Sequence, residues 1–159
     1  MVWYICFMAI VMIILVALWK KMKTEAEEEF DINFLIISGS KIGFKIASVT
    51  QEEVDKNDAV LDEDRSLRRD IVLWGHSSGP FGAIRKLKKM DEIFLNLKGE
   101  WMKYVVVRSE IAIDGQKNLI SYTDGLDLLN NEYEFETIRL VTCAEQEGLR
   151  WVAIGRKIS

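Results

Sequence analysis

The chain has 159 residues, of which 49% are hydrophobic, and it carries a net charge of -4 at pH 7. This length suits one domain with an appendage rather than two domains. A negative net charge argues against nucleic acid as the main partner, because phosphate binding requires a basic face.

The first feature along the chain is an apolar segment, Val2 to Trp19, that contains no charged residue. It is just long enough to cross a hydrocarbon core, which takes roughly 17 to 20 residues. A buried core helix would show a polar face, and a cleaved signal peptide would have a basic region before it and a small-residue cleavage pattern after it. We therefore expect an uncleaved transmembrane anchor with a short charged linker over residues 1–29, followed by one domain over residues 30–159.

The first half of that domain predicts short strands separated by charged loops. Residues 34–49 hold two apolar runs broken by Ser-Gly-Ser, which is typical of strand-turn-strand. Residues 51–70 are highly charged and predict surface loop around one short strand at Ala59 to Leu61. Residues 70–74, DIVLW, predict a buried strand, and a partial helical period predicts a short helix from about Phe81 to Met90.

The second half is more clearly β. Two long apolar runs surround Lys98-Gly99 and predict a hairpin with glycine at its turn. Residues 135–142 and 149–157 alternate between apolar and polar and predict a final strand pair. Many short strands at close spacing favour a mainly β fold, an antiparallel barrel or sandwich rather than a parallel α/β sheet.

The stretch GHSSG at residues 75–79 matches the G-x-S-x-G pattern of the serine hydrolases and would make Ser77 the nucleophile. In that class the catalytic base is a histidine far downstream of the serine. The chain has one histidine, His76, which is adjacent to Ser77 and poorly placed to take its proton. A β-rich domain of this size also disagrees with that class, so the serine hydrolase is a distant alternative.

The single histidine has a second possible role, because the domain also has a single cysteine. Cys6 lies in the apolar segment, whereas Cys143 ends a predicted strand and His76 follows another. A sole histidine and a sole thiol at strand ends are what a cysteine-histidine catalytic pair would look like. The alternatives are a histidine without a role and a cysteine that acts as a small buried hydrophobe.

Two segments of the chain resemble the sortases. The stretch IRLVTC, followed by RWVAI, is similar to the sortase signature Thr-Leu-x-Thr-Cys with an arginine on the next strand; Leu140, Thr142 and Cys143 match it, and Arg139 departs from it. The stretch from residue 71 to residue 95 resembles the sortase strand that ends in Gly-His and continues into a Phe-Gly helix. Residues 30–69 depart from the family pattern, so the resemblance assigns no substrate-binding residue there.

The resemblance implies a closed β-barrel of about eight strands on a single N-terminal anchor. It assigns His76 to the catalytic histidine, Cys143 to the nucleophile and Arg150 to the arginine, which would stabilise the oxyanion or orient the substrate. Thr142, next to the nucleophile, would contribute a hydroxyl or a backbone N–H to the oxyanion hole. Arg156 is a fallback for the arginine.

The resemblance also implies a function, which is transpeptidation. Cys143 would attack the Thr-Gly bond of a Leu-Pro-x-Thr-Gly-like sorting signal on an exported protein, and the thioacyl group would pass to an amine on a cell-wall precursor or a pilin lysine. A catalytically inactive, membrane-tethered peptide-binding domain of the same fold is the alternative function.

No cofactor is expected. A calcium site, as in some sortases, would need acidic ligands, but carboxylate runs are usually solvated loops and the chain lacks EF-hand spacing. The candidate calcium ligands are Asp62, Glu63, Asp64, Glu145 and Glu147.

Two arguments disagree about the side of the membrane on which the domain lies. Lys20, Lys21 and Lys23 follow the apolar segment and favour a cytoplasmic domain by the positive-inside rule. Sortase substrates are exported, however, and a large translocated domain can override this charge bias. We expect a single-pass protein of the cell membrane whose domain lies outside the cytoplasm.

Overall fold

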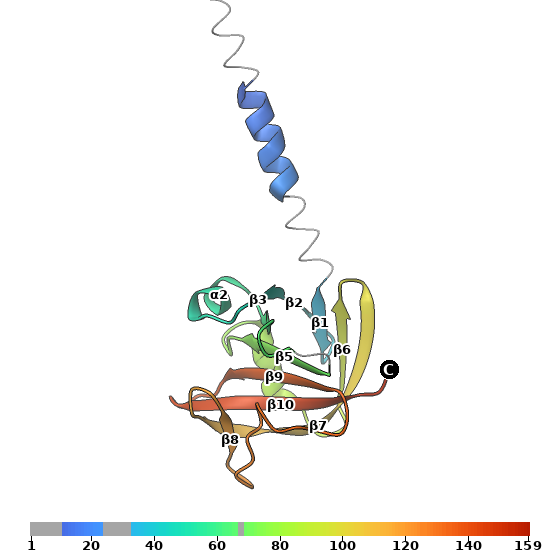
Figure 1. Cartoon of the computed structure of the whole chain (residues 1–159), viewed down its shortest axis with the longest axis vertical. Helices are drawn as coiled ribbons and strands as arrows, with labels where there is room; N and C mark the ends of the chain where they lie inside the picture. The colour runs from blue at the N-terminus through green and yellow to red at the C-terminus, as the bar shows by residue number, and fades with distance from the viewer. Residues whose placement is uncertain (1–10, 24–32, 67–68) are drawn as a thin grey trace, which may run out of the picture.

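The structure is a computed structural model that describes residues 11–23, 33–66 and 69–159 (Figure 1). The apolar segment expected to be an anchor lies partly outside these residues, and residues 11–23 form a helix with mostly exposed side chains. Within the described ranges, no helix is both long and apolar enough to cross a membrane.

The described part of the domain is built on one ten-stranded sheet with the order β2-β1-β6-β7-β10-β9-β5-β4-β3, to which β8 adds by pairing with β7. The strands are β1 (Phe34–Ile37), β2 (Ser40–Gly43), β3 (Lys45–Ala47), β4 (Val60–Asp62), β5 (Asp70–Gly75), β6 (Glu92–Leu97), β7 (Glu100–Asp114), β8 (Leu119–Ser121), β9 (Thr137–Cys143) and β10 (Leu149–Lys157).

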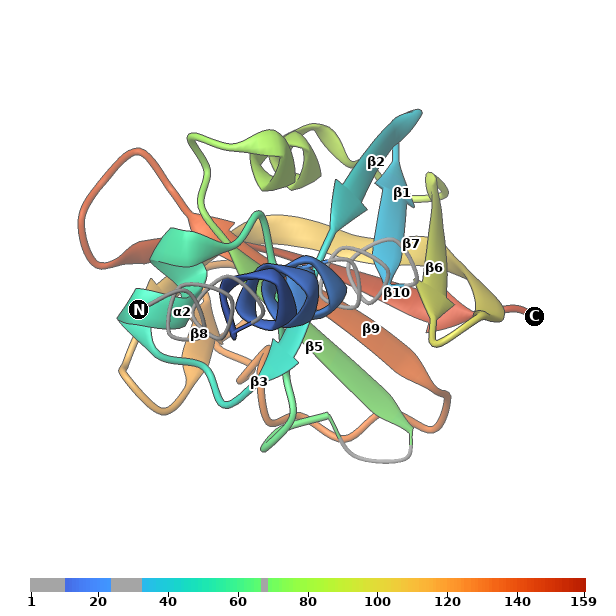
Figure 2. The same cartoon turned by 90° about the horizontal axis from the view of Figure 1, so that it is seen from above.

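One bent segment joins the two ends of this strand order. Strands β2 and β3 are separated only by Phe44, yet they occupy opposite ends of the sheet. The Phe44 N–H donates to the Asn33 carbonyl beside β1, and the Lys45 N–H donates to the Ala59 carbonyl beside β4, both at 3.1 Å. The sheet therefore curls into a nearly closed barrel, as the view in Figure 2 shows.

The sheet is mixed, which corrects the prediction of a purely antiparallel barrel. β3 pairs with β4 in parallel, and β5 pairs with β9 in parallel. Ten strands among the described residues also exceed the expected eight or so, partly because the bent segment counts as two. The β5–β9 pair has the larger consequence, because parallel neighbours end at the same edge of a sheet.

Two predicted hairpins are present, and each turns on a residue pair with positive φ. Ser38 and Gly39 have φ angles of 49° and 82°, and Lys98 and Gly99 have φ angles of 53° and 86°. Positive φ at both central residues is the geometry of a type I′ turn, whose twist matches that of the flanking strands.

The charged stretch expected to be a loop contains a short helix, α2 (Gln51–Lys56). The Thr50 side chain caps it by accepting a hydrogen bond from the Glu53 N–H at 3.2 Å. Thr50-x-x-Glu53 has the form of a capping box, which was the signal for a helix start. The predicted helix after residue 80 is a 3₁₀ helix, η1 (Pro80–Lys86), which ends four residues earlier than expected.

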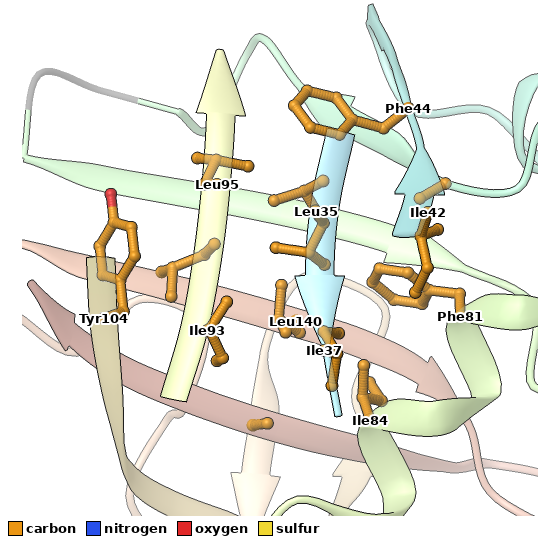
Figure 3. Close-up of a cluster of buried hydrophobic side chains, with 14 of the residues drawn as sticks. Leu35, Ile37, Ile42, Phe44, Phe81, Ile84, Ile93, Leu95, Tyr104 and Leu140 are labelled. Atoms are coloured by element: carbon orange, nitrogen blue, oxygen red, sulfur yellow. The ribbon is translucent and has the colours of Figure 1, made fainter. Parts of the chain in front are cut away.

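The core has two parts because β5, β9 and β10 are covered on both faces. Leu73 and Leu140 belong to the cluster inside the barrel, whereas Val72 and Val141 face a second cluster outside it that includes Leu128. Successive side chains of a strand point to opposite faces, so both faces of these strands are apolar. The predicted strand is present as β9, but the polar residues of its alternating pattern are covered too, since six of its seven residues are buried. Figure 3 shows part of the inner cluster, with Leu35, Ile37, Ile93, Leu95, Tyr104 and Leu140 among its labelled members.

Gly75, the last residue of β5, allows a close approach between β5 and the segments over it. A Cβ atom there would lie 2.6 Å from Phe81 Cγ and 2.7 Å from the Asp58 carbonyl oxygen. Gly75→Ala is therefore expected to lower the free energy of unfolding by about 1–3 kcal/mol, the usual cost of overpacking. The measurement is urea denaturation, with Gly79→Ala as the control, because the nearest atom to its added Cβ would lie 3.9 Å away. Equal urea midpoints for the two variants would contradict this account.

Candidate active site

The ends of three neighbouring strands meet at one end of the barrel. Gly75 at the end of β5 is in register with Thr142 of β9, and Cys143 at the end of β9 is in register with Arg150 of β10. His76 follows Gly75 directly, so the histidine and the cysteine leave adjacent parallel strands at the same edge. The loop between β9 and β10 and helix α2 lie on the same side of the molecule in Figure 2.

A cavity of about 250 Å³ lies at this edge, and His76, Thr142, Cys143 and Arg150 all line it. The four residues predicted for the site are therefore brought together around one space. The other lining residues come from the strand ends and from the α2 region: Val49, Thr50, Gln51, Val54, Trp74, Gly75, Asp114, Gln116 and Val141.

The cysteine sulfur is in direct contact with the arginine. Arg150 Nη1 donates to Cys143 Sγ at 2.8 Å, and both residues are half-buried. A guanidinium is permanently charged. The Cys143 sulfur therefore has a fixed positive charge beside it.

A carboxylate that the sequence analysis missed holds the arginine in place. Arg150 Nε donates to Asp114 Oδ2 at 2.8 Å, which leaves Nη1 directed at the sulfur. Asp114 is the last residue of β7, and β7 pairs with β10 so that Ala112 faces Arg150. This pairing between distant segments decides that Asp114 reaches the site, and no local pattern marked it.

A second carboxylate holds the histidine. His76 Nε2 lies 2.6 Å from Asp55 Oδ1 on α2. The hydrogen bond with His76 lowers the pKa of Asp55 below its ordinary value, so Asp55 is an ionised acceptor at neutral pH. The sequence did not mark Asp55 as a site residue, because its helix was predicted to be a loop.

Thr142 lines the cavity, but its hydroxyl has another partner. Its Oγ1 donates to the Gly75 carbonyl at 2.7 Å, and the residue is only 2% exposed. The hydroxyl proton therefore ties β9 to β5 at the level of the site. This observation argues against the expected contribution of the Thr142 hydroxyl to an oxyanion hole.

The alternative site residues lie elsewhere. Arg156 sits at the other end of β10, where its guanidinium lies over the Phe135 ring at 5.8 Å from the centroid. Ser77 does not line the cavity that His76 lines.

Some of the acidic residues that are candidate calcium ligands form hydrogen bonds or ion pairs with other protein groups. Asp62 accepts hydrogen bonds from the Trp74 indole and from the Asp64 and Arg65 backbone, and Glu63 accepts one from Ser48. Glu145 lies 3.8 Å from Arg85. In the part of the chain that the structure describes, no group of three or more His, Cys, Asp or Glu side chains is arranged to hold a metal ion.

Comparison with models of protein families identifies the family of this chain. The model of the Sortase domain matches residues 28–158. The chain belongs to the sortase family. No curated protein sequence matches this sortase.

Solved sortase structures share its fold at low sequence identity. Sortase C from Streptococcus pneumoniae matches with a TM-score of 0.63 and 19% identity, over 80% of this chain and 68% of that chain. Sortase C from Clostridium perfringens SM101 matches with a TM-score of 0.60 and 19% identity, over 79% and 68%. A lid mutant of sortase A from Corynebacterium diphtheriae matches with a TM-score of 0.64 and 17% identity, over 80% and 70%. The nearly closed, mainly β barrel of this sortase is therefore the sortase fold.

Proposed function

We propose that this sortase is a cysteine transpeptidase with Cys143 as nucleophile, His76 as general acid and base, and Arg150 as the cation that faces the reacting carbonyl. One observation carries the proposal: the Cys143 sulfur lies 2.8 Å from the Arg150 guanidinium, and both residues line a cavity that His76 also lines. This arrangement combines an activated thiol, a proton carrier and a fixed positive charge, which are the three parts that acyl transfer through a thioester requires.

In the first half-reaction the Cys143 thiolate attacks the carbonyl carbon of the scissile peptide bond. A C–S bond forms, and the charge that develops on the carbonyl oxygen is stabilised by the Arg150 guanidinium. His76, as imidazolium, donates its proton to the departing amine as the C–N bond breaks. The product is a thioester on Cys143 and a released peptide with a free amino group.

In the second half-reaction an amine acceptor attacks the thioester. Neutral His76 takes the proton from the attacking nitrogen, a new C–N bond forms, and the C–S bond breaks to restore the thiolate. The net reaction exchanges one amide for another, and it needs no cofactor or metal.

The proposed substrate is the sorting signal of an exported protein, with a Leu-Pro-x-Thr-Gly-like sequence. Two structural neighbours support this class: a Clostridium perfringens sortase C structure is described with the C-terminal cell wall sorting motif, and the Streptococcus pneumoniae sortase C structure is described in terms of pilin substrate specificity. For this sortase we propose the same class of peptide, with a cell-wall precursor or a pilin lysine as the amine acceptor.

A second cavity supports transfer between two bound reactants. It has a volume of about 650 Å³ and is lined by Gly82, Arg85 and Lys86 of η1, by the β9–β10 loop and by Trp151. Ala144, which follows Cys143 directly, lines it. Cys143 thus lines the cavity that His76 lines, and the next residue of the chain lines the cavity beside η1.

We also propose that residues 1–29 anchor this sortase in the cell membrane and that its barrel lies outside the cytoplasm, where exported substrates are found. The support is the uncharged sequence from Val2 to Trp19. A reporter enzyme that works only outside the cytoplasm, fused after Ser159, is expected to be active. An inactive reporter, with a cytoplasmic reporter active at the same position, would contradict this orientation.

The experiment that tests the function uses the full chain and a library of peptides based on Leu-Pro-x-Thr-Gly. Transpeptidation predicts release of the fragment that begins with glycine, and a new amide when an amine such as triglycine is added. Binding of a peptide without cleavage, together with iodoacetamide alkylation of Cys143 that does not depend on His76, would support the inactive peptide-binding domain instead.

A further inference from the structure

Helix α2 turns one face toward the site. Gln51, Val54 and Asp55 are spaced three and four residues apart and share this face. Gln51 and Val54 line the cavity of the site, and Asp55 reaches the imidazole of His76. The histidine is thus bounded on one side by a helix that belongs to a different part of the barrel.

Asp55 is held in the direction of the imidazole. Gln51 Nε2 donates to the same Asp55 Oδ1 atom at 2.7 Å, one turn earlier in the helix. The helix itself is tied to β3 by the ion pair between Glu53 and Lys45 at 2.9 Å, and its start is capped by Thr50. The Asp55 side chain is 55% exposed, and the hydrogen bond from Gln51 in its own helix orients the carboxylate toward the imidazole.

The geometry points to Asp55 as the positioning residue of His76: it fixes the N–H of the imidazole at Nε2 and leaves Nδ1 as the nitrogen that exchanges a proton with substrate. The assignment of Nδ1 as the reacting nitrogen rests on the proposed function, whereas the assignment of the tautomer does not.

The physical reason is the donor and acceptor inventory of the two groups. An ionised carboxylate only accepts hydrogen bonds, and a neutral imidazole has one N–H donor and one lone pair. At 2.6 Å from Asp55 Oδ1, Nε2 must carry the hydrogen. The lone pair is then at Nδ1, where it can accept a proton from the attacking amine, and in the imidazolium the Nδ1 proton is the one free to leave.

The test uses the fact that the chain has one histidine, so ¹⁵N-histidine labelling yields a single pair of ring-nitrogen resonances. Spectra recorded at a pH above the histidine titration are expected to show the Nε2–H tautomer in the wild-type chain. Asp55→Ala is expected to shift the ring nitrogens toward a mixture of tautomers, and Asp55→Glu, which restores the carboxylate, is expected to restore the wild-type pattern.

A matched control is available on the same helix. Glu52 pairs with Lys56 at 2.5 Å and does not face the site, so Glu52→Gln removes one negative charge from α2 without touching His76. Glu52→Gln is expected to leave both the spectrum and the turnover unchanged. For Asp55→Ala we expect kcat to fall roughly tenfold with little change in KM, because a misdirected base costs proton transfer rather than binding.

The outcomes separate this proposal from the proposed function. Identical tautomer populations in the wild-type and Asp55→Ala chains would overturn it. A changed tautomer with an unchanged kcat would overturn Nδ1 as the reacting nitrogen. If the wild-type chain cleaves no sorting-signal peptide, the proposed function fails, while the ¹⁵N spectra still decide whether Asp55 sets the tautomer.

Discussion

Cys143→Ala is expected to abolish every covalent adduct between this sortase and a sorting-signal peptide. The thioester needs a sulfur at this position, and the remaining groups of the cavity, His76, Thr142 and Arg150, offer no comparable nucleophile. Intact-mass spectrometry of the full chain after brief incubation with peptide measures the adduct directly. The expected wild-type spectrum contains a second species heavier by the acyl fragment, and the Cys143→Ala spectrum does not.

The chain provides its own control for this experiment. Cys6 is the only other cysteine, and it lies outside the domain that contains the site. Cys6→Ala is therefore expected to form the adduct at the wild-type level. An adduct that persists in Cys143→Ala, or one that disappears in Cys6→Ala, would exclude Cys143 as the nucleophile.

His76→Ala is expected to lower the rate of acyl transfer by about 10²- to 10⁴-fold, the usual contribution of a general acid or base. In the proposed mechanism the imidazole carries the proton in both half-reactions, and the chain has no second histidine to replace it. The Arg150 guanidinium stays beside the sulfur in this variant, so slow acylation is expected rather than none. Release of the glycine fragment, followed by chromatography under single-turnover conditions, measures the rate.

Ser77→Ala is the matched control for the histidine variant, because Ser77 is the neighbouring residue and does not line the cavity. Its rate is expected to stay near that of the wild type. This control also tests the serine-hydrolase alternative, in which Ser77→Ala would be the inactive variant and a fluorophosphonate probe would label Ser77. A near-wild-type rate for His76→Ala would remove the histidine from the reaction.

Much of the fold could be predicted from local sequence patterns. The hairpins at Ser38-Gly39 and Lys98-Gly99 follow from glycine in turns that need positive φ, and the last strand, β10, has the bounds that its sequence predicted. A sole histidine and a sole domain cysteine at strand ends also indicated two side chains that line one cavity in the structure. These predictions succeed because turn geometry and residue chemistry are local properties of the chain.

The relative placement of those side chains is a property of strand pairing, which local patterns do not specify. His76 and Cys143 share an edge because β5 and β9 run in parallel, whereas the strand pattern favoured antiparallel neighbours. Alternation along a strand says which face is apolar, but it does not name the partner strand or its direction. The same reason explains Asp114, which reaches Arg150 only through the pairing of β7 with β10.

Asp55, the carboxylate beside His76, is the clearest case of a site residue that the sequence alone does not predict. No residue of α2 is buried, so the helix has no apolar period to reveal it, and only the Thr50-Glu53 capping pair marks its start. Residue counts singled out an imidazole and a thiol in this chain, and the resemblance to the sortases added the Arg150 guanidinium. The tertiary fold added the two carboxylates, Asp55 and Asp114, because each belongs to a different element from its partner: Asp55 comes from α2, and Asp114 comes from β7, which pairs with β10.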